Sequence, residues 1–272
     1  MAPMLYKNRV CLRATNIFLI VFFTCLSGQV ALGQALNVAT IGDSVGANDV
    51  SRIAIRNTIS EADGEVDFFG NSTVADIPTF ARSGTNIRQM LEGRTVASGA
   101  SEPGFVSYQE AFSDVDFGAV VIFGGYNDVI QAEPDSNQVQ NGLNLKALVN
   151  TINERWNVDT IFVVRLYDLD YDNDPLVATN WEDRQGNVDR LNSYIDQLAT
   201  DIANVETIEI NDFLDPSHYR ADGLHLNDAG QTVAGEQIGQ ALLELQAVPE
   251  PSSFGFLSLI MAASYLRIRR RS

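Results

Sequence analysis

A small serine stands at the point where an apolar run of the sequence ends. The run belongs to NVATIGDSVGAND, residues 37–49, and Ser44 follows it after one glycine and one aspartate. A serine hydroxyl attacks a carbonyl efficiently only when a nearby base accepts its proton. A helix is expected to begin at Ser44, and its positive end favours an oxyanion, but serine at a helix start is also a common N-cap. Ser44 is therefore a candidate nucleophile or a helix cap.

The sequence contains only two histidines that could serve as the base. His225 lies in ADGLHLNDAG, and Asp222 precedes it by three positions. On a loop, this spacing lets the carboxylate accept a hydrogen bond from Nδ1 and leaves Nε2 free to take the Ser44 proton. His218, in DPSHYRADG, is expected to be a loop or rim residue.

Acyl transfer also needs hydrogen-bond donors for the oxyanion, and two segments offer them. Asn127, in FGGYNDV (123–129), directly follows an apolar run and has a side-chain amide. Gly84, in ARSGTNIRQ (81–89), precedes a predicted helix, and its N–H can approach a ligand without obstruction by a Cβ. The alternatives are structural: Asn127 and Asp128 cap a turn, and Gly84 serves a turn with positive φ.

Strands are the first of the elements that are expected to position these residues. Short runs rich in β-branched and aromatic residues predict strands, and several are apolar almost throughout, as strands covered on both faces are. These runs are LNVATI (36–41), EVDFF (65–69), AVVIF (119–123), TIFVVRLY (160–167) and ETIEI (206–210).

Helical patterns alternate with the later strands. Apolar residues recur at helical spacing in the segments 145–156, 188–202 and 234–245, and Asn227 or Asp228 is the expected N-cap of the last helix. This alternation predicts one α/β domain with a parallel sheet of about five strands and right-handed crossovers. Ligands bind beyond the carboxyl ends of such strands, which is where Ser44 and Asn127 are expected.

The motifs together resemble the SGNH (GDSL-type) hydrolase family. They are Gly-Asp-Ser-Val at 42–45, the later Gly84, Gly-Tyr-Asn-Asp at 125–128 and Asp-Gly-Leu-His at 222–225. They occur in the family's order, and the resemblance covers essentially all of residues 36–247. It implies a single-domain three-layer sandwich with helices on both faces, the flavodoxin-like SGNH fold. Valine replaces the leucine of the first motif, a mild apolar change.

By this resemblance, Ser44 is the nucleophile, His225 the base and Asp222 the residue that orients it. The backbone N–H groups of Ser44 and Gly84 and the amide of Asn127 form the oxyanion hole. The implied reaction is hydrolysis of a carboxylic ester through an acyl-enzyme, with no cofactor. A metal-dependent hydrolase is disfavoured, because one site histidine and scattered acids do not form a ligand cluster.

The N-terminal segment is typical of a secretory signal peptide. Residues 1–16 carry three basic and no acidic side chains, and IFLIVFFTCLSG then supplies a short apolar core. Small residues in ALGQA offer cleavage near Gly33 or Ala35. Residues 1–33 are therefore assigned to a signal peptide for Sec export, with an uncleaved anchor as the alternative.

The C-terminal segment, residues 248–272, combines a Pro-Glu-Pro turn, a short apolar stretch and a final arginine cluster. Arginines of this kind stay on the cytoplasmic side while the preceding chain lies outside. The pattern resembles the PEP-CTERM sorting signal, and that resemblance implies processing by an exosortase at the cell envelope. A plain C-terminal membrane anchor is the alternative. The expected location is secreted or attached to the envelope, with membrane contact only through the terminal segments.

Charge and cysteine content narrow the possible partners. Without residues 1–33 and 249–272, the chain loses seven of its 18 basic residues and one of its 35 acids, which leaves a net charge of −23. Such a surface repels nucleic acid and anionic membranes. Both cysteines, Cys11 and Cys25, lie in the signal segment, so a processed chain has no disulfide, thiol nucleophile or cysteine-based metal site.

The expected substrate is a small ester or an acylated carbohydrate. The envelope context favours removal of acetyl groups from extracellular polysaccharide, but short-chain lipid esters, aryl esters and thioesters fit the same triad. A non-catalytic envelope protein or polysaccharide-binding protein on the same fold is the alternative of a different class. The intact set of site residues argues against it.

An acidic loop follows the fourth predicted strand. Asp168, Asp170, Asp172 and Asp174 alternate in YDLDYDNDP, as in a calcium loop. The glycine and the twelfth-position glutamate of an EF-hand are missing, so a solvated loop is the preferred interpretation. Trp181 or Tyr171 could stack on a sugar at the substrate rim or simply cover the core.

Overall fold

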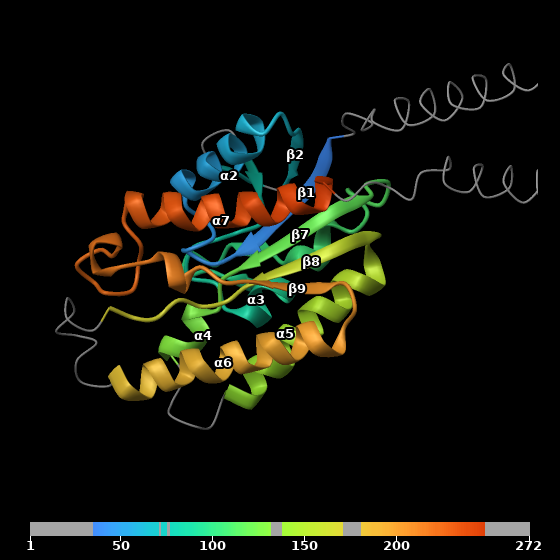
Figure 1. Cartoon of the computed structure of the whole chain (residues 1–272). Coiled ribbons are helices and arrows are strands. Elements are labelled where there is room, and N and C mark those ends of the chain that lie inside the picture. Colours follow the sequence, from blue (N-terminus) through green and yellow to red (C-terminus); the bar gives the residue numbers. More distant parts are fainter. Residues whose placement is uncertain (1–34, 71, 75–76, 132–137, 171–180, 248–272) are drawn as a thin grey trace, which may run out of the picture. The chain divides into compact units, whose positions relative to one another are not determined.

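A sheet of five parallel strands runs through the centre of the computed structural model (Figure 1). The structure describes residues 35–70, 72–74, 77–131, 138–170 and 181–247. Ala35–Ala247 form one compact unit. The strand order is β2-β1-β7-β8-β9, and the strands are β1 (Leu36–Gly42), β2 (Val66–Phe69), β7 (Phe117–Phe123), β8 (Val158–Val164) and β9 (Val205–Ile208).

The five predicted strands are confirmed, with shifted ends. The largest shift concerns the segment 160–167, because β8 begins at Val158 and ends at Val164. Tyr167 therefore lies just beyond the carboxyl end of β8. In the register of the sheet, Gly42 at the end of β1 pairs with Phe123 at the end of β7. The loops that follow these two strands consequently start side by side.

Helices cover both faces of the sheet (Figure 1). Helices α2 (Asp49–Glu61) and α7 (Asp228–Ala247) pack against each other on one face. The other face carries α3 (Ile87–Glu92), α4 (Tyr126–Gln131), α5 (Gln138–Arg155) and α6 (Trp181–Asp201). The predicted α/β fold, a three-layer sandwich with a parallel sheet, is confirmed.

Asparagines begin three of these helices. Asn48 caps α2 and Asn86 caps α3, where Gln89 completes a capping box. At α7, the Asn227 side chain accepts from the N–H groups of Ala229 and Gly230. Of the two expected caps of the last helix, Asn227 is therefore the one used. Each cap supplies an acceptor to N–H groups that the helix itself leaves unpaired.

The apolar patterns of the sequence become the core. Residues of β1 and β7 are buried almost completely, including Val38, Ile41 and Val120. The predicted helix faces are buried too: Leu148 and Ile152 are 0% exposed. This explains why the strands read as continuous apolar runs, since helices cover them on both sides.

The described part also contains two hairpins that the sequence did not predict. One joins β3 (Ser72–Val74) to β4 (Ile77–Thr79), and the other joins β5 (Gly93–Thr95) to β6 (Ser101–Pro103). Strands of three residues are too short to show an alternating pattern. A 3-10 helix, η1 (Phe105–Tyr108), follows the second hairpin.

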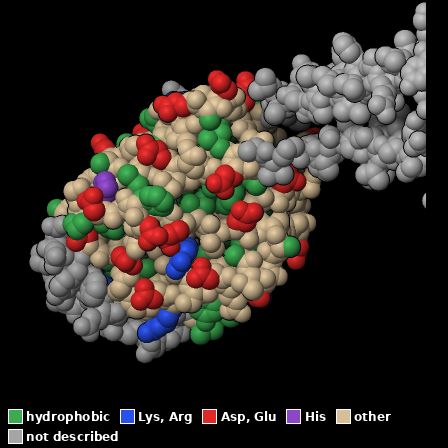
Figure 2. Space-filling model, in the orientation of Figure 1, with side chains coloured by type: hydrophobic (Ala, Val, Ile, Leu, Met, Phe, Trp, Pro, Cys, Tyr) green, Lys and Arg blue, Asp and Glu red, His purple; other side chains and the backbone are tan. Residues whose placement is uncertain are grey.

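The surface is strongly acidic, as the composition requires. Figure 2 shows acidic side chains spread over one face, with few lysines or arginines among them. Among the described residues, no helix is both long and apolar enough to cross a membrane.

Two helical glycines provide a matched test of the packing between α2 and α7. A Cβ at Gly235 would lie 2.2 Å from the Ser51 carbonyl oxygen. Among the described residues, a Cβ at Gly186 in α6 would meet just the Arg190 side chain, at 3.7 Å. We expect Gly235→Ala to lower the free energy of unfolding by about 1–3 kcal/mol. Gly186→Ala should raise it by about 0.5–1 kcal/mol through helix propensity. Urea unfolding of both variants measures this, and equal effects would contradict the close packing of α7 on α2.

Candidate active site

The loop after β1 presents Ser44. Residues 43–47 form turns, and α2 begins only at Asp49 with Asn48 as its N-cap. The expectation that Ser44 stands at the start of the first helix is therefore wrong. Ser44 does not cap α2, because the Asn48 side chain accepts from the Val50 N–H there. The position after the carboxyl end of a strand is as expected.

The structure brings His225 to Ser44 from 181 residues away. The Ser44 Oγ and the His225 Nε2 are 3.2 Å apart, within hydrogen-bond distance. Ser44 is half-buried, and the His225 side chain is 32% exposed. The hydroxyl thus has an acceptor for its proton, on an imidazole that is partly open to solvent.

Asp222 holds the opposite side of the His225 ring. The distance between Nδ1 and Asp222 Oδ2 is 2.7 Å, and Oδ1 accepts from the N–H groups of Leu224 and His225. Desolvation acts to raise the pKa of Asp222, but these hydrogen bonds outweigh it and leave the pKa below its usual value. The ionised carboxylate therefore favours the tautomer with its proton on Nδ1, which leaves Nε2 to accept from Ser44.

Hydrogen bonds from the segment that follows β8 support the loop that carries His225. The Tyr167 hydroxyl donates to the Leu224 carbonyl at 2.9 Å, and the Asp170 N–H donates to the Gly223 carbonyl at 2.8 Å. On the other side of the loop, the Arg220 N–H donates to the His225 carbonyl. The loop is therefore held by its backbone on both sides of the imidazole.

Tyr167 also connects this loop with the start of α4. The Tyr126 hydroxyl donates to the Tyr167 carbonyl at 2.9 Å, and the two rings lie 4.8 Å apart. Both side chains are buried, and burial raises the pKa of each well above its usual value. They remain neutral phenols that can donate hydrogen bonds. Nothing in the sequence pattern pointed to this pair.

Asp43, the residue before Ser44, is a buried carboxylate that the sequence analysis did not single out. Its Oδ2 accepts from the N–H groups of Gly125 and Tyr126 at 2.9 and 3.0 Å, and its Oδ1 accepts from Val45 at 2.9 Å. Burial raises the pKa of Asp43, and these hydrogen bonds oppose the shift. The side chain joins the loop after β1 to the loop after β7.

Glycines on both sides of Ser44 allow the two loops to approach. A Cβ at Gly42 or Gly46 would lie 2.0 or 2.4 Å from the Phe123 carbonyl oxygen. No side chain fits at either position, so the turn that carries Ser44 lies directly against the end of β7. Of these two glycines, Gly42 opens the first motif and Gly46 directly follows it.

Gly84 lies in the exposed loop that follows β4. Its φ is +73°, a conformation that disfavours residues other than glycine. Among the described residues, neither the Gly84 N–H nor the Ser44 N–H has a hydrogen-bond acceptor. Two backbone donors are thus available for a ligand, as an oxyanion hole requires. The alternative role of Gly84 in a turn with positive φ applies as well, and the two roles are compatible.

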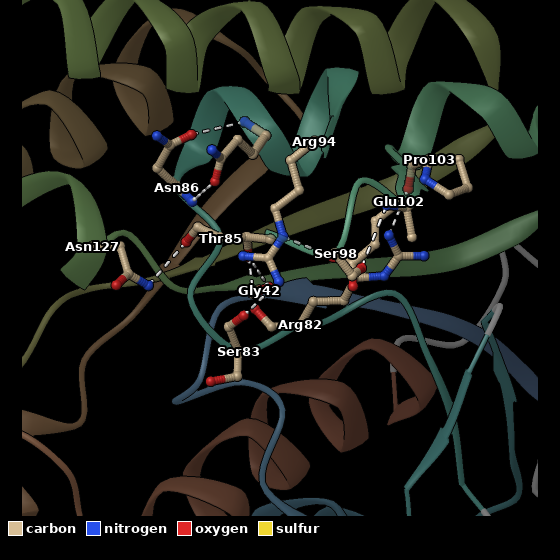
Figure 3. Close-up of polar contacts among 12 residues, drawn as sticks. Gly42, Arg82, Ser83, Thr85, Asn86, Arg94, Ser98, Glu102, Pro103 and Asn127 are labelled. Atoms are coloured by element: carbon tan, nitrogen blue, oxygen red, sulfur yellow. Dashed lines mark hydrogen bonds and ion pairs between the residues drawn. The ribbon is translucent and has the colours of Figure 1, made fainter. Parts of the chain in front are cut away.

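Asn127 and Asp128 connect this loop to α4. The Asn127 Nδ2 donates to the Thr85 carbonyl at 3.0 Å (Figure 3). The amide expected to serve as an oxyanion donor is thus attached to the loop that carries Gly84. Asp128 Oδ2 accepts from the Ile87 N–H at the start of α3. The Asp128 carboxylate thus pairs with a backbone donor at a helix start that is distant in sequence.

His218 and Asp168, two of the remaining candidates, pair with other residues. His218 is in the 3-10 helix η4 (Pro216–His218), where its Nδ1 accepts from the Asp215 N–H. Asp168 accepts hydrogen bonds from Gln185 and Asn211. Asp172, Asp174 and Tyr171 lie outside the described residues, as does the side chain of Trp181. In the described part, no group of three or more histidines, cysteines or acids could hold a metal ion.

Comparison with known proteins identifies a family. Residues 40–233 match the GDSL-like Lipase/Acylhydrolase family. None of the curated proteins matches the chain.

Solved structures share the fold at low sequence identity. A carbohydrate esterase family 3 protein from Talaromyces cellulolyticus superimposes with a TM-score of 0.55 at 16% identity, over 78% of this chain and 98% of that one. A family 3 carbohydrate esterase from Clostridium thermocellum gives 0.54 at 16% identity, over 80% and 100%. Est24, a carbohydrate acetylesterase from Sinorhizobium meliloti, gives 0.54 at 15% identity, over 77% and 99%.

Asp128 makes the stability of the site region depend on pH. Burial raises its pKa to about 7, the nearby Asp43 adds to the rise, and the hydrogen bond from Ile87 opposes it. An unfolded aspartate titrates near ~3.9, so the folded chain binds this proton more tightly. The stabilisation is complete below about pH 4 and is lost as the pH rises through about 7.

We therefore expect the stability of the wild type, relative to Asp128→Asn, to fall between about pH 4 and pH 7. Asparagine mimics the neutral carboxyl group and does not titrate in this range. Urea unfolding at several pH values measures the difference. A difference that stays constant, or that grows with pH, would exclude a raised pKa at Asp128.

Proposed function

We propose that this chain, which belongs to the GDSL-like lipase/acylhydrolase family, is a serine esterase that hydrolyses carboxylic esters through an acyl-enzyme. The single observation that supports this best is the alignment of three side chains. Ser44 Oγ lies 3.2 Å from His225 Nε2, and His225 Nδ1 lies 2.7 Å from Asp222. A hydroxyl, an imidazole and a carboxylate in this order are the parts of a nucleophilic triad.

In the proposed mechanism, Ser44 Oγ attacks the ester carbonyl carbon while His225 Nε2 accepts its proton. Asp222 stabilises the imidazolium that forms, and His225 then gives the proton to the leaving alcohol. Water, deprotonated by the same imidazole, hydrolyses the acyl-enzyme and restores the serine.

The oxyanion formed in both steps needs donors. The N–H groups of Ser44 and Gly84 have no acceptor among the described residues. The Asn127 amide, which donates to the Thr85 carbonyl, is the third donor that the sequence resemblance to the SGNH family implies. We assign these three groups to the oxyanion hole. Preorganised donors of this kind stabilise the transition state because they need no reorientation during the reaction.

The proposed substrate is an acetylated carbohydrate. Support comes from the similar structures, which are named as carbohydrate esterases and a carbohydrate acetylesterase. It also comes from the terminal segments, which in sequence resemble an export signal and a PEP-CTERM sorting signal. These segments lie outside the described residues, so secretion, exosortase processing and attachment to the envelope rest on the sequence. Activity on short acyl chains as a lipase or thioesterase is the alternative.

Replacement of the nucleophile tests the proposed reaction. We expect residues 34–248 to hydrolyse p-nitrophenyl acetate faster than the butyrate and octanoate esters. Ser44→Ala should lower kcat by about 10⁴-fold or more, because the attacking atom is gone. The exposed Ser113, whose hydroxyl contacts Glu110, gives the control variant Ser113→Ala, which should keep full activity.

The outcomes separate the alternatives. Activity that persists in Ser44→Ala excludes Ser44 as the nucleophile. A preference for octanoate favours the lipase-like alternative over the acetylesterase. A folded wild type that is inactive on these esters and on acetylated xylan favours the non-catalytic binding protein.

Asn127→Ala tests the oxyanion hole separately. We expect kcat to fall by about 10²–10³-fold with little change in KM, because the donor acts mainly on the transition state. The lost hydrogen bond to Thr85 should cost only about 1 kcal/mol of folding stability. Steady-state kinetics combined with urea unfolding measures both effects. A loss of activity that merely follows unfolding would remove Asn127 from the oxyanion hole.

A further inference from the structure

A short hairpin lies beside the loop that carries Gly84. Strands β5 and β6 pair antiparallel, with Arg94 directly opposite Glu102. The hairpin follows α3 immediately, so its position is coupled to the helix that begins just after the Gly84 loop. Figure 3 shows the Arg94 side chain pointing from this hairpin toward Ser83.

The Arg94 guanidinium makes two polar contacts with different nitrogens. Its Nε contacts Glu102 Oε2 at 2.7 Å, and its Nη2 donates to the Ser83 carbonyl at 2.9 Å. The Arg94 and Glu102 side chains are 19% and 34% exposed, respectively. The pair is thus partly shielded from water, unlike an ordinary surface ion pair. The planar guanidinium carries several N–H donors in fixed positions, so it can contact Glu102 and the Ser83 carbonyl at the same time.

The third nitrogen of this side chain lies against Gly84 itself. A Cβ built on Gly84 would be 3.3 Å from Arg94 Nη1. The guanidinium therefore packs on the backbone of the glycine whose N–H is assigned to the oxyanion hole. It also holds the carbonyl of Ser83, which is part of the same peptide unit as the Gly84 N–H. Fixing that carbonyl fixes the direction of the N–H, because the peptide unit is planar.

Arg82 ties the other end of the loop to the same hairpin. Its backbone N–H donates to the Gly42 carbonyl, and its Nη1 donates to the Pro103 carbonyl at 2.9 Å. The loop is therefore attached to β1 by its backbone and to the hairpin by two arginines. Of these, only Arg94 contacts the peptide unit that carries the Gly84 N–H.

We propose that Arg94, held by Glu102, is a positioning residue that orients the Gly84 N–H toward the oxyanion. This inference rests on the proposed function and names a residue for that same site. The charge of Arg94 is offset by Glu102, so its effect is geometric. A donor displaced by a fraction of an ångström loses much of its effect on the transition state, while ground-state binding changes little.

The test compares full-length variants with a matched arginine. Arg94→Ala should lower kcat about 10- to 100-fold with KM little changed. Arg94→Lys keeps the charge and most of the stem but supplies one nitrogen in place of several, so kcat should also fall. Arg88→Ala is the control. Arg88 pairs with Glu92 at 2.9 Å on the outer side of α3, with side chains 68% and 56% exposed, and its loss should leave kcat unchanged.

Chemical rescue separates positioning from a general loosening of the fold. Truncation of Arg94 opens space beside a narrow cavity lined by Arg82, Thr85 and Glu102. Guanidinium chloride at millimolar, non-denaturing concentration should restore a large part of the kcat of Arg94→Ala. Tetramethylammonium chloride, which has no N–H donors, should not. Adding Glu102→Gln to Arg94→Ala should weaken the rescue, because Glu102 would hold the guanidinium.

The outcomes distinguish this inference from the proposed function. If Ser44→Ala is inactive while both Arg94 variants keep the wild-type kcat, the role of Arg94 is overturned and the esterase remains. A loss of kcat that guanidinium does not restore in a folded Arg94→Ala variant also overturns it. Activity that persists in Ser44→Ala overturns the proposed function and this inference together.

Discussion

The rest of the site depends on the hydrogen bonds that the buried Asp43 side chain accepts. A carboxylate without solvent must be satisfied by donors, or its burial costs several kcal/mol. Here three backbone N–H groups surround it, one from its own turn and two from the loop after β7. These hydrogen bonds exist only when β1 and β7 are neighbours, so they join sheet formation to the position of Ser44. The flanking glycines let the two backbones come close enough for the contact.

A second set of hydrogen bonds connects the segment that carries His225 to the segment that carries Ser44. Tyr126 donates its N–H to Asp43 and its hydroxyl to Tyr167, and Tyr167 in turn donates to the carbonyl before His225. A continuous polar path thus runs from the residue before Ser44 to the residue before His225. These hydrogen bonds resist breaking, because a buried donor left without an acceptor lowers the free energy of unfolding. The separation of Ser44 and His225 is set by these contacts as well as by their own.

The motif residues serve structure and chemistry together. Asn127 fixes Thr85 with one hydrogen of its amide, and Asp128 satisfies the start of α3. The Gly84 loop lies between these contacts on one side and the β5–β6 hairpin on the other. The proposed oxyanion donors are therefore carried by loops, but the loops are held by elements of the sandwich. A site built in this way keeps its donors oriented before a substrate arrives.

The sequence by itself determined the features that depend on local pattern. The alternation of apolar runs and helical spacing predicted the parallel sheet, and Asp222 could be paired with His225 because it precedes the histidine by three positions in one loop. Tertiary structure decided everything that joins distant segments. Asp43 meets Gly125 across 82 residues, and Tyr167 meets Leu224 across 57. No local pattern reveals such partners, and three-residue strands are too short to show a period. The placement of Ser44 in a turn, five residues before its helix, was likewise set by the packing of that turn against β7.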